Sequence, residues 1–164
     1  MNKIRKALIS VYNKKDLKPL LNALSKYKIN IISSGGTYKK IRRLGFKCIE
    51  LSKFTNTPEI LNGRVKTLHP KIYGGILNKR LNKKHCREIK KNNYENIDLV
   101  VANFYPFEDT LLKKADHNKI IENIDIGGPT MVRAAAKNYN DVVVICNPNQ
   151  YRRFINELET NKGS

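Results

Sequence analysis

A run of serine and glycine at residues 33–37 (SSGGT) has the residue types that bind a phosphate group. Gly35 and Gly36 would let the backbone approach an anion closely, and free N–H groups at the start of a helix favour negative charge. The hydroxyls of Ser34 and Thr37 would add two hydrogen-bond donors. The alternative is an ordinary tight turn in which Thr37 is the N-cap of the following helix.

Three cations could complete such a site. Lys14 follows the first apolar run of the chain, and Arg64 and Lys66 belong to the segment GRVKT at residues 63–67. Arginine offers a planar fork of donors and lysine a compact charge, so this combination suits a phosphorylated or carbonyl-bearing ligand. Because the chain is strongly basic, the alternative for each of the three is a solvated surface side chain.

The segment NFYPF at residues 103–107 directly follows another apolar run. Asn103 could hydrogen-bond a planar amide or the edge of a base, and Tyr105 could donate to a developing oxyanion. Both would face a ligand if the apolar run is a strand that ends at the ligand-binding edge of a sheet. Phe104 and Phe107 are interpreted as core residues.

A fourth segment, DIGGPT at residues 125–130, leads into a helical pattern that ends near Lys137. Asp125 could cap this helix or supply a carboxylate, and the backbone N–H groups of Ile126 and Gly127 could stabilise an oxyanion. The ordinary role of Lys137 would be a favourable interaction with the helix dipole. A straight helix would place Asp125 and Lys137 about 18 Å apart. They can share a site only if the helix begins late and the turn folds back.

The elements that must position these segments alternate between short apolar runs and helical patterns, which is typical of βαβ units and a mainly parallel sheet. Strands are expected at residues 7–11, 29–32, 48–51, 98–103 and 141–146. Helices are expected over residues 17–24 with Asn13 as N-cap, and over 37–44, 80–93, 117–124, 129–138 and 148–160. Residues 52–79 do not fit the alternation, and so long an irregular segment indicates a functional role.

Composition narrows the class of protein. The chain has 164 residues, 40% of them hydrophobic, which suits one domain, and no apolar run is long enough for a membrane span. Three cysteines without a C-x-x-C pair disfavour a disulfide scaffold or a zinc site and suit the cytoplasm. The net charge of +18 would attract nucleic acids or anionic small molecules. The lysines are scattered, which favours a compositional bias over a nucleic-acid-binding surface.

Five stretches together resemble the IMP cyclohydrolase domain of the bifunctional AICAR transformylase/IMP cyclohydrolase family. They are ALISV, SSGGT, GRVKTLHPKIYGGIL, ANFYPF and ENIDIGGPTMVRAAAKN, in the order and with the spacing of that family. The resemblance implies a methylglyoxal-synthase-like fold, which is a doubly wound α/β domain with a mainly parallel sheet and helices on both faces. It implies that this domain spans residues 1–158 and that residues 159–164 begin a linker toward an absent transformylase domain.

The resemblance also implies a reaction on a purine nucleotide. A formamido imidazole-carboxamide ribonucleotide closes its six-membered ring, loses water and becomes IMP, with no cofactor and no metal. Lys66 and Tyr105 would polarise the formyl oxygen or stabilise the oxyanion, and Lys137 would transfer protons with Asp125 as its partner. The expected substrate-binding residues are Ser10, Tyr12, Asn13, Lys14, Ser34, Gly35, Gly36, Thr37, Arg64, Val65, Lys66, Thr67, Ala102, Asn103, Asp125, Ile126 and Gly127.

After the first strand the family commonly has Ser-Val-Ser-Asp-Lys, whereas this chain has SVYNK, so that the bulky phenol of Tyr12 replaces a small hydroxyl beside the expected phosphate site. If the Tyr12 side chain faced the ligand, phosphate binding would change. Three alternatives remain open: a nucleotide sensor of the same fold, an RNA-binding domain, and methylglyoxal synthase. The last is disfavoured because the chain lacks the typical Gly-Thr-Thr-Gly and Gly-Asp-Gln-Gln stretches. A homodimer and a separate transformylase domain are the possible protein partners.

Overall fold

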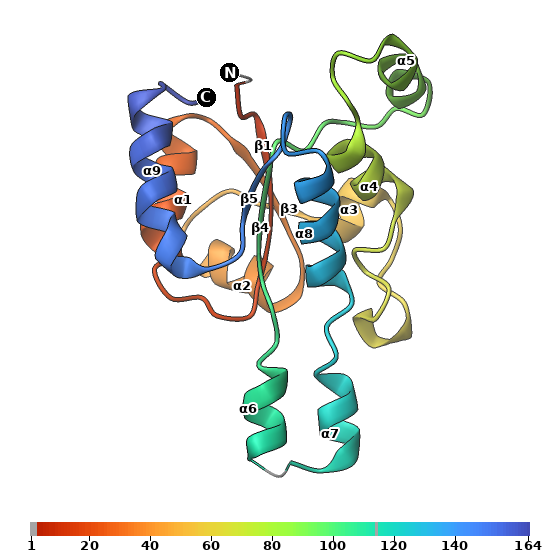
Figure 1. The fold of residues 1–164 in the computed structure, drawn as a ribbon, viewed down its shortest axis with the longest axis vertical. Coiled ribbons are helices and arrows are strands. Elements are labelled where there is room, and N and C mark those ends of the chain that lie inside the picture. The colour runs from red at the N-terminus through yellow and green to blue at the C-terminus, as the bar shows by residue number, and fades with distance from the viewer. Residues whose placement is uncertain (1–2, 114) are drawn as a thin grey trace.

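Five parallel strands form a single sheet in the computed structural model, which describes residues 3–113 and 115–164. The strands are β1 (Lys6–Val11), β2 (Asn30–Ser33), β3 (Ile49–Glu50), β4 (Leu99–Asn103) and β5 (Val143–Ile145). They lie in the order β3-β2-β1-β4-β5 (Figure 1). All the pairings between them are parallel, so their C-terminal ends meet at one edge.

The two central strands read as continuous apolar runs because helices cover both faces of the sheet. Along β1, Ala7, Ile9 and Val11 belong to one hydrophobic cluster and Leu8 to the other. This alternation follows from the two-residue period of a strand. The predicted doubly wound α/β fold is confirmed, and the sheet is entirely parallel within the described residues.

Three helices cover each face of the sheet. One cluster gathers α1 (Leu17–Lys26), α2 (Gly35–Arg43) and α9 (Tyr151–Thr160), and the other gathers α3 (Leu51–Thr55), α4 (Pro70–Leu77) and α8 (Gly127–Lys137). In Figure 1, α1 and α9 lie on one side of the sheet and α8 and α4 on the other. The remaining elements are η1 (Leu61–Gly63), α5 (Lys83–Lys91), α6 (Phe107–Leu112), α7 (His117–Glu122) and η2 (Pro148–Gln150). No helix in the described ranges has the length and apolar character that a membrane crossing needs.

The prediction that residues 52–79 are irregular is wrong, because α3, η1 and α4 lie there. Helix α4 was hidden by its two internal glycines. Gly75 packs so closely against the chain that a Cβ there would lie 2.4 Å from the carbonyl oxygen of Glu95. The ring of His69 caps this helix by accepting the Lys71 N–H at 3.1 Å. Residues 70–77 therefore form a helix that is stabilised by packing, although their sequence pattern indicated a loop.

Several predicted boundaries also shift. Helix α2 begins at Gly35 and α8 at Gly127, each two residues before the predicted start. The N-cap of α1 is Asp16, in a left-handed conformation, and not Asn13. Both helices therefore begin at the first glycine of a glycine pair.

Helices α6 and α7 form a hairpin that projects from the body, at the end of the molecule opposite the two termini (Figure 1). We call residues 107–124 the arm. No residue of α6 or α7 is buried. The expected solvated helix near residues 80–93 is confirmed as α5, which also has no buried residue.

Candidate active site

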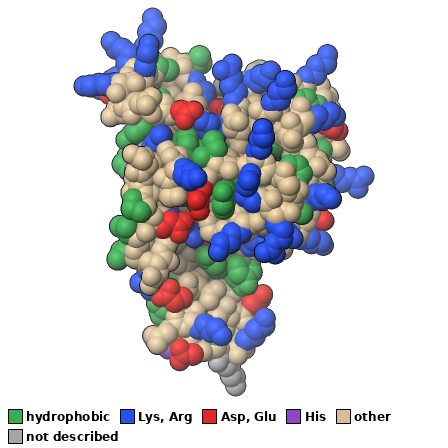
Figure 2. Space-filling view, turned by 180° about the vertical axis from the view of Figure 1, so that it is seen from behind, with side chains coloured by type: hydrophobic (Ala, Val, Ile, Leu, Met, Phe, Trp, Pro, Cys, Tyr) green, Lys and Arg blue, Asp and Glu red, His purple; other side chains and the backbone are tan. Residues whose placement is uncertain are grey.

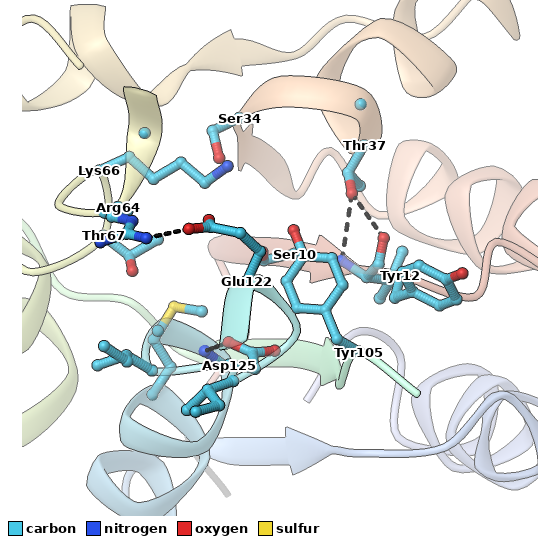
Figure 3. A pocket seen from close by; sticks show the side chains of 18 of the residues that line it. Ser10, Tyr12, Ser34, Thr37, Arg64, Lys66, Thr67, Tyr105, Glu122 and Asp125 are labelled. Carbon is cyan, nitrogen blue, oxygen red and sulfur yellow. Dashed lines mark hydrogen bonds and ion pairs between the residues drawn. The ribbon is translucent and has the colours of Figure 1, made fainter. Parts of the chain in front are cut away.

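One cavity of about 450 Å³ lies at the C-terminal edge of the sheet, where the four sequence segments meet (Figure 3). Its walls come from the ends of β1 and β2, the starts of α2 and α8, the loop after η1 and the base of the arm. The expected site residues that line it are Ser10, Tyr12, Lys14, Ser34, Gly36, Thr37, Arg64, Lys66, Thr67, Tyr105, Asp125, Ile126 and Gly127.

The start of α2 forms the part of the cavity best suited to an anion. Ser34 is its N-cap, and its buried side chain makes no hydrogen bond to the described residues. Gly35 has a φ of 51°, a conformation that favours glycine. A Cβ on Gly35 would lie 3.4 Å from Lys66 Nζ. The Lys66 ammonium therefore lies beside the N-terminus of α2, and Figure 3 shows it pointing toward Ser34.

The Thr37 hydroxyl was expected to donate to a phosphate group, but it bonds to the backbone of Val11. It donates to the Val11 carbonyl at 2.9 Å and accepts the Val11 N–H at 3.2 Å, in a buried position. Its single proton is thus engaged with the backbone. In this structure Thr37 holds α2 against the end of β1 and presents no free donor to the cavity.

Asn103 is likewise engaged within the protein. Its Oδ1 accepts the Asn13 N–H at 2.7 Å, and its Nδ2 donates to the Asn13 carbonyl at 2.9 Å. These two bonds tie the loop after β1 to the end of β4. The amide that was expected to hydrogen-bond a base edge therefore positions the loop that carries Lys14.

Lys14 lies on the cavity wall and donates from Nζ to the Tyr12 carbonyl at 3.0 Å. Partial burial lowers its pKa below the ordinary value of 10.5, and the nearby positive charge of Lys40 lowers it further. An anion bound beside Lys14 would favour its charged form and so offset both effects.

Two tyrosines meet at the outer side of the cavity. The rings of Tyr12 and Tyr105 are 5.4 Å apart and inclined by 60°, which is an edge-to-face arrangement. Figure 3 shows Tyr105 beside Ser10, whereas the Tyr12 ring points away from Ser34 and Lys66. The residue that departs from the family therefore contacts Tyr105 and leaves the start of α2 open.

The start of α8 forms the opposite wall. Asp125 Oδ1 accepts the Gly128 N–H at 2.9 Å, so this carboxylate caps the helix while it lines the cavity. Gly127 approaches Thr67 so closely that a Cβ would lie 2.4 Å from Thr67 Oγ1. Glycine here allows the loop after η1 to contact the helix that bounds the site.

We expect Gly127→Ala to lower the free energy of unfolding by about 1–3 kcal/mol, because the added methyl group overpacks against the buried Thr67. Urea unfolding followed by circular dichroism measures this. Gly36→Ala is the matched control: nothing lies within 4 Å of its Cβ, so its stability should not fall. Unchanged stability of Gly127→Ala, or no recovery when Thr67→Ala is added, would show that the close approach is unimportant.

Arg64 and Glu122 form an ion pair across the cavity, between the loop after η1 and helix α7 (Figure 3). Glu122 was not predicted as a site residue, and neither were the other lining residues Val11, Asn62, Gly63, Ile121, Ile124, Gly128 and Met131. Glu122 begins the stretch ENIDIGGPTMVRAAAKN that carries part of the family resemblance, but its residue type alone did not indicate a role in the site. Only the fold brings it to Arg64, which lies 58 positions away.

Six expected site residues do not line the cavity: Asn13, Gly35, Val65, Ala102, Asn103 and Lys137. Ala102 is fully buried in the core, and Asn13 and Asn103 bond to each other. Lys137 is the last residue of α8, whose first residue, Gly127, lines the cavity. Ten residues of helix separate them by about 15 Å. Among the described residues, no group of three or more His, Cys, Asp or Glu side chains could hold a metal ion.

The fold is a five-stranded parallel α/β domain whose cavity lies at the C-terminal edge of the sheet, which is where ligands bind in this class of fold. The profile of the MGS-like domain matches residues 16–130. The chain belongs to this family.

Two curated relatives and one solved structure are similar to the chain over most of its length. The chain is 51% identical over 160 residues to the bifunctional purine biosynthesis protein PurH of Acetivibrio thermocellus, covering 97% of this chain and 31% of that protein. It is 49% identical over 156 residues to PurH of Clostridium acetobutylicum, with 95% and 31% covered. The chain thus spans about a third of the length of these relatives. The crystal structure of ForH has a TM-score of 0.84 and 30% identity, covering 98% of this chain and 83% of that one.

Proposed function

We propose that this chain is an IMP cyclohydrolase, which closes the ring of a formamido imidazole-carboxamide ribonucleotide to give IMP and water. The observation that carries the proposal is that Lys66, Tyr105 and the starts of α2 and α8 share one cavity. The homology to PurH supports a place in purine biosynthesis. We assign no transformylase activity to the chain, and we place the reaction in the cytoplasm.

The phosphate end of the substrate fits the start of α2. The Ser34 hydroxyl makes no hydrogen bond to the described residues, and the N-terminal residues of this nine-residue helix line the cavity. Lys14 supplies a cation on the same side of the cavity. Charge-assisted hydrogen bonds of this kind orient a phosphate and fix the rest of the nucleotide.

The reacting groups then lie toward Tyr105 and the start of α8. The carboxamide nitrogen attacks the formyl carbon, so that a C–N bond forms and negative charge develops on the formyl oxygen. Lys66, the Tyr105 hydroxyl and the N–H groups near Ile126 and Gly127 are the donors proposed to stabilise that oxygen. One proton from each of the two nitrogens leaves with it as water. Holding both groups in place removes much of the entropic barrier.

We assign Asp125 two roles, because it caps α8 through Gly128 and also presents a carboxylate to the cavity. The proton-transfer role that the resemblance implies for Lys137 stays a prediction, since this residue lies at the far end of α8. Lys137→Ala tests it directly. The role requires a fall in kcat with nucleotide binding retained, and an unchanged kcat would remove Lys137 from the mechanism.

The proposed function is tested by the absorbance change when the folded chain meets the formylated ribonucleotide. We expect turnover well above the spontaneous rate. Tyr105→Phe keeps the ring contact with Tyr12 and removes only the hydroxyl, so it should lower kcat while IMP still binds. Binding of IMP without turnover would support the sensor alternative and reject the enzyme.

A pH dependence follows from Lys14. Since its pKa lies below that of an ordinary lysine, we expect IMP affinity to weaken as the pH rises through that lowered pKa, by about tenfold in all. Titration calorimetry between about pH 7 and pH 10 measures this. Lys14→Arg keeps its charge over the whole range, so its affinity should change less with pH. Equal pH profiles for the two proteins would exclude Lys14 from the phosphate site.

A further inference from the structure

The Tyr105 hydroxyl, one of the proposed oxyanion donors, has little support from its own loop. Tyr105 lies between β4 and α6 and is 44% exposed. Among residues 3–113 and 115–164, no group hydrogen-bonds to its hydroxyl. A donor to an oxyanion must be held within about 0.5 Å of its working position. Another side chain must therefore hold the Tyr105 ring in place.

The ring of Tyr12 is placed to hold it. The centroids of the Tyr12 and Tyr105 rings are 5.4 Å apart and the ring planes are inclined by 60°. This edge-to-face arrangement is attractive, because the positive edge of one ring meets the negative face of the other. Within the part of the chain that the structure describes, it is the one aromatic contact of Tyr105. Since the contact acts on the ring, it also orients the hydroxyl that the ring carries.

Tyr12 is itself fixed by the end of the sheet. It directly follows β1, whose last residue, Val11, pairs in register with Asn103 at the end of β4. The Tyr12 N–H donates to the Asn103 carbonyl at 3.4 Å, and the Tyr12 carbonyl accepts from Lys14 Nζ at 3.0 Å. Both backbone groups of Tyr12 are thus engaged, so its ring is a fixed support for a residue in the next loop.

We propose that Tyr12 is a positioning residue, whose ring holds the Tyr105 ring so that the Tyr105 hydroxyl faces the substrate. Figure 3 shows the Tyr12 ring pointing away from Ser34 and Lys66, so it acts through Tyr105 and not on the phosphate. A serine at position 12, which is common in the family, has no ring for this contact. The role rests on the proposed function, because it concerns the donor to the formyl oxygen.

Tyr12→Ser tests the role by steady-state kinetics. We expect kcat to fall by about three- to tenfold, the factor that corresponds to the loss of one aromatic pair. The affinity for IMP should stay within about twofold, since the contact of Tyr12 with Lys14 uses the backbone. Figure 2 shows lysine and arginine side chains spread over the body, and this uncharged substitution leaves their attraction for a phosphate unaltered.

Two further variants show whether the ring is what matters. Tyr12→Phe keeps the ring, so it should recover the rate that Tyr12→Ser loses. Tyr139→Ser is the matched control, because it removes the ring of another exposed tyrosine, 75% exposed, that does not line the cavity. Its kcat should equal that of the wild type. A Tyr12→Phe enzyme as slow as Tyr12→Ser would overturn the proposed role.

A double-mutant cycle separates positioning from a general structural effect. In the Tyr105→Phe background the hydroxyl is absent, so adding Tyr12→Ser should cause no further fall in kcat. Additive losses would show that Tyr12 does not act through Tyr105. A raised KM with unchanged kcat in Tyr12→Ser would show that Tyr12 contacts the substrate itself, which also contradicts the role.

NMR of the chain with isotope-labelled tyrosine measures the ring contact without any substrate. The chain has eight tyrosines, and the signal that Tyr105→Phe removes belongs to Tyr105. A neighbouring ring shifts such a signal, so Tyr12→Ser should move it and Tyr12→Phe should not. An unmoved signal, or an active wild type whose kcat Tyr12→Ser leaves unchanged, would reject the positioning role alone. No turnover by the wild type would reject the proposed function, and the positioning role with it.

Discussion

We expect Lys66→Met to lower kcat by roughly 10²–10³-fold, because a single preorganised donor to an oxyanion contributes about that much. The Lys66 ammonium lies beside Gly35, and within residues 3–113 and 115–164 it has no carboxylate partner. By contrast, Arg64, the other cation of the same segment, is paired with Glu122. Lys66 is therefore the cation of this loop that is available to the ligand. Steady-state kinetics with the formylated ribonucleotide measures the effect.

Lys39→Met is the matched control for this prediction. Lys39 lies on α2 near the site but is exposed and does not line the cavity, so the variant changes the net charge equally. Its kcat should stay within about twofold of the wild type. If both variants lost activity to the same extent, the effect would come from overall charge and not from a donor. A Lys66→Met enzyme with wild-type kcat and a raised KM would limit Lys66 to phosphate binding.

The sequence predicted the sheet and the place of the site well because those features depend on local patterns. Buried parallel strands are apolar on both faces, so β1 and β4 were visible as uninterrupted runs. Parallel strands that share one edge bring the segments after them together, which is why four separated motifs line one cavity.

The partners of individual polar groups were not predictable in the same way. Thr37 and Asn103 have the right types to bind a ligand, but the fold places each within reach of a backbone group of β1 or the loop after it. A sequence pattern does not show which acceptor lies nearest in space. Glu122 was not predicted to bind a ligand, yet it lines the cavity because helix α7 brings it there.

The length and start of helix α8 determine how far apart Asp125 and Lys137 lie. The sequence required a late helix start for the two to meet, and the structure begins α8 early, at Gly127. Gly127 allows close contact with Thr67 at this first helical position. Asp125 lines the cavity just before the helix begins, whereas Lys137 lies at the far end of the helix and does not line the cavity.

At the opposite edge of the sheet, one arginine joins the starts of three strands. Arg80 donates to Asp98 Oδ1 at 2.8 Å, to the Ile97 carbonyl at 3.0 Å and to the Asp141 carbonyl at 2.7 Å. Asp98 in turn accepts the backbone N–H groups of Arg5 and Lys6 at 2.8 and 3.0 Å. Most of this network is shielded from water: the side chain of Arg80 is 14% exposed and that of Asp98 11%.

We expect Arg80→Met to lower the free energy of unfolding by about 3–5 kcal/mol, because it leaves a buried carboxylate without its counter-charge. Urea unfolding followed by circular dichroism measures the change. Arg153→Met is the matched control: the Arg153 side chain is 86% exposed in its pair with Glu157, so the loss there should be below about 1 kcal/mol. Adding Asp98→Asn to Arg80→Met removes one buried charge while keeping an acceptor for the Arg5 and Lys6 N–H groups. The double variant should regain part of the loss, and a further loss would show that the charge of Asp98 is not what makes the single variant unstable.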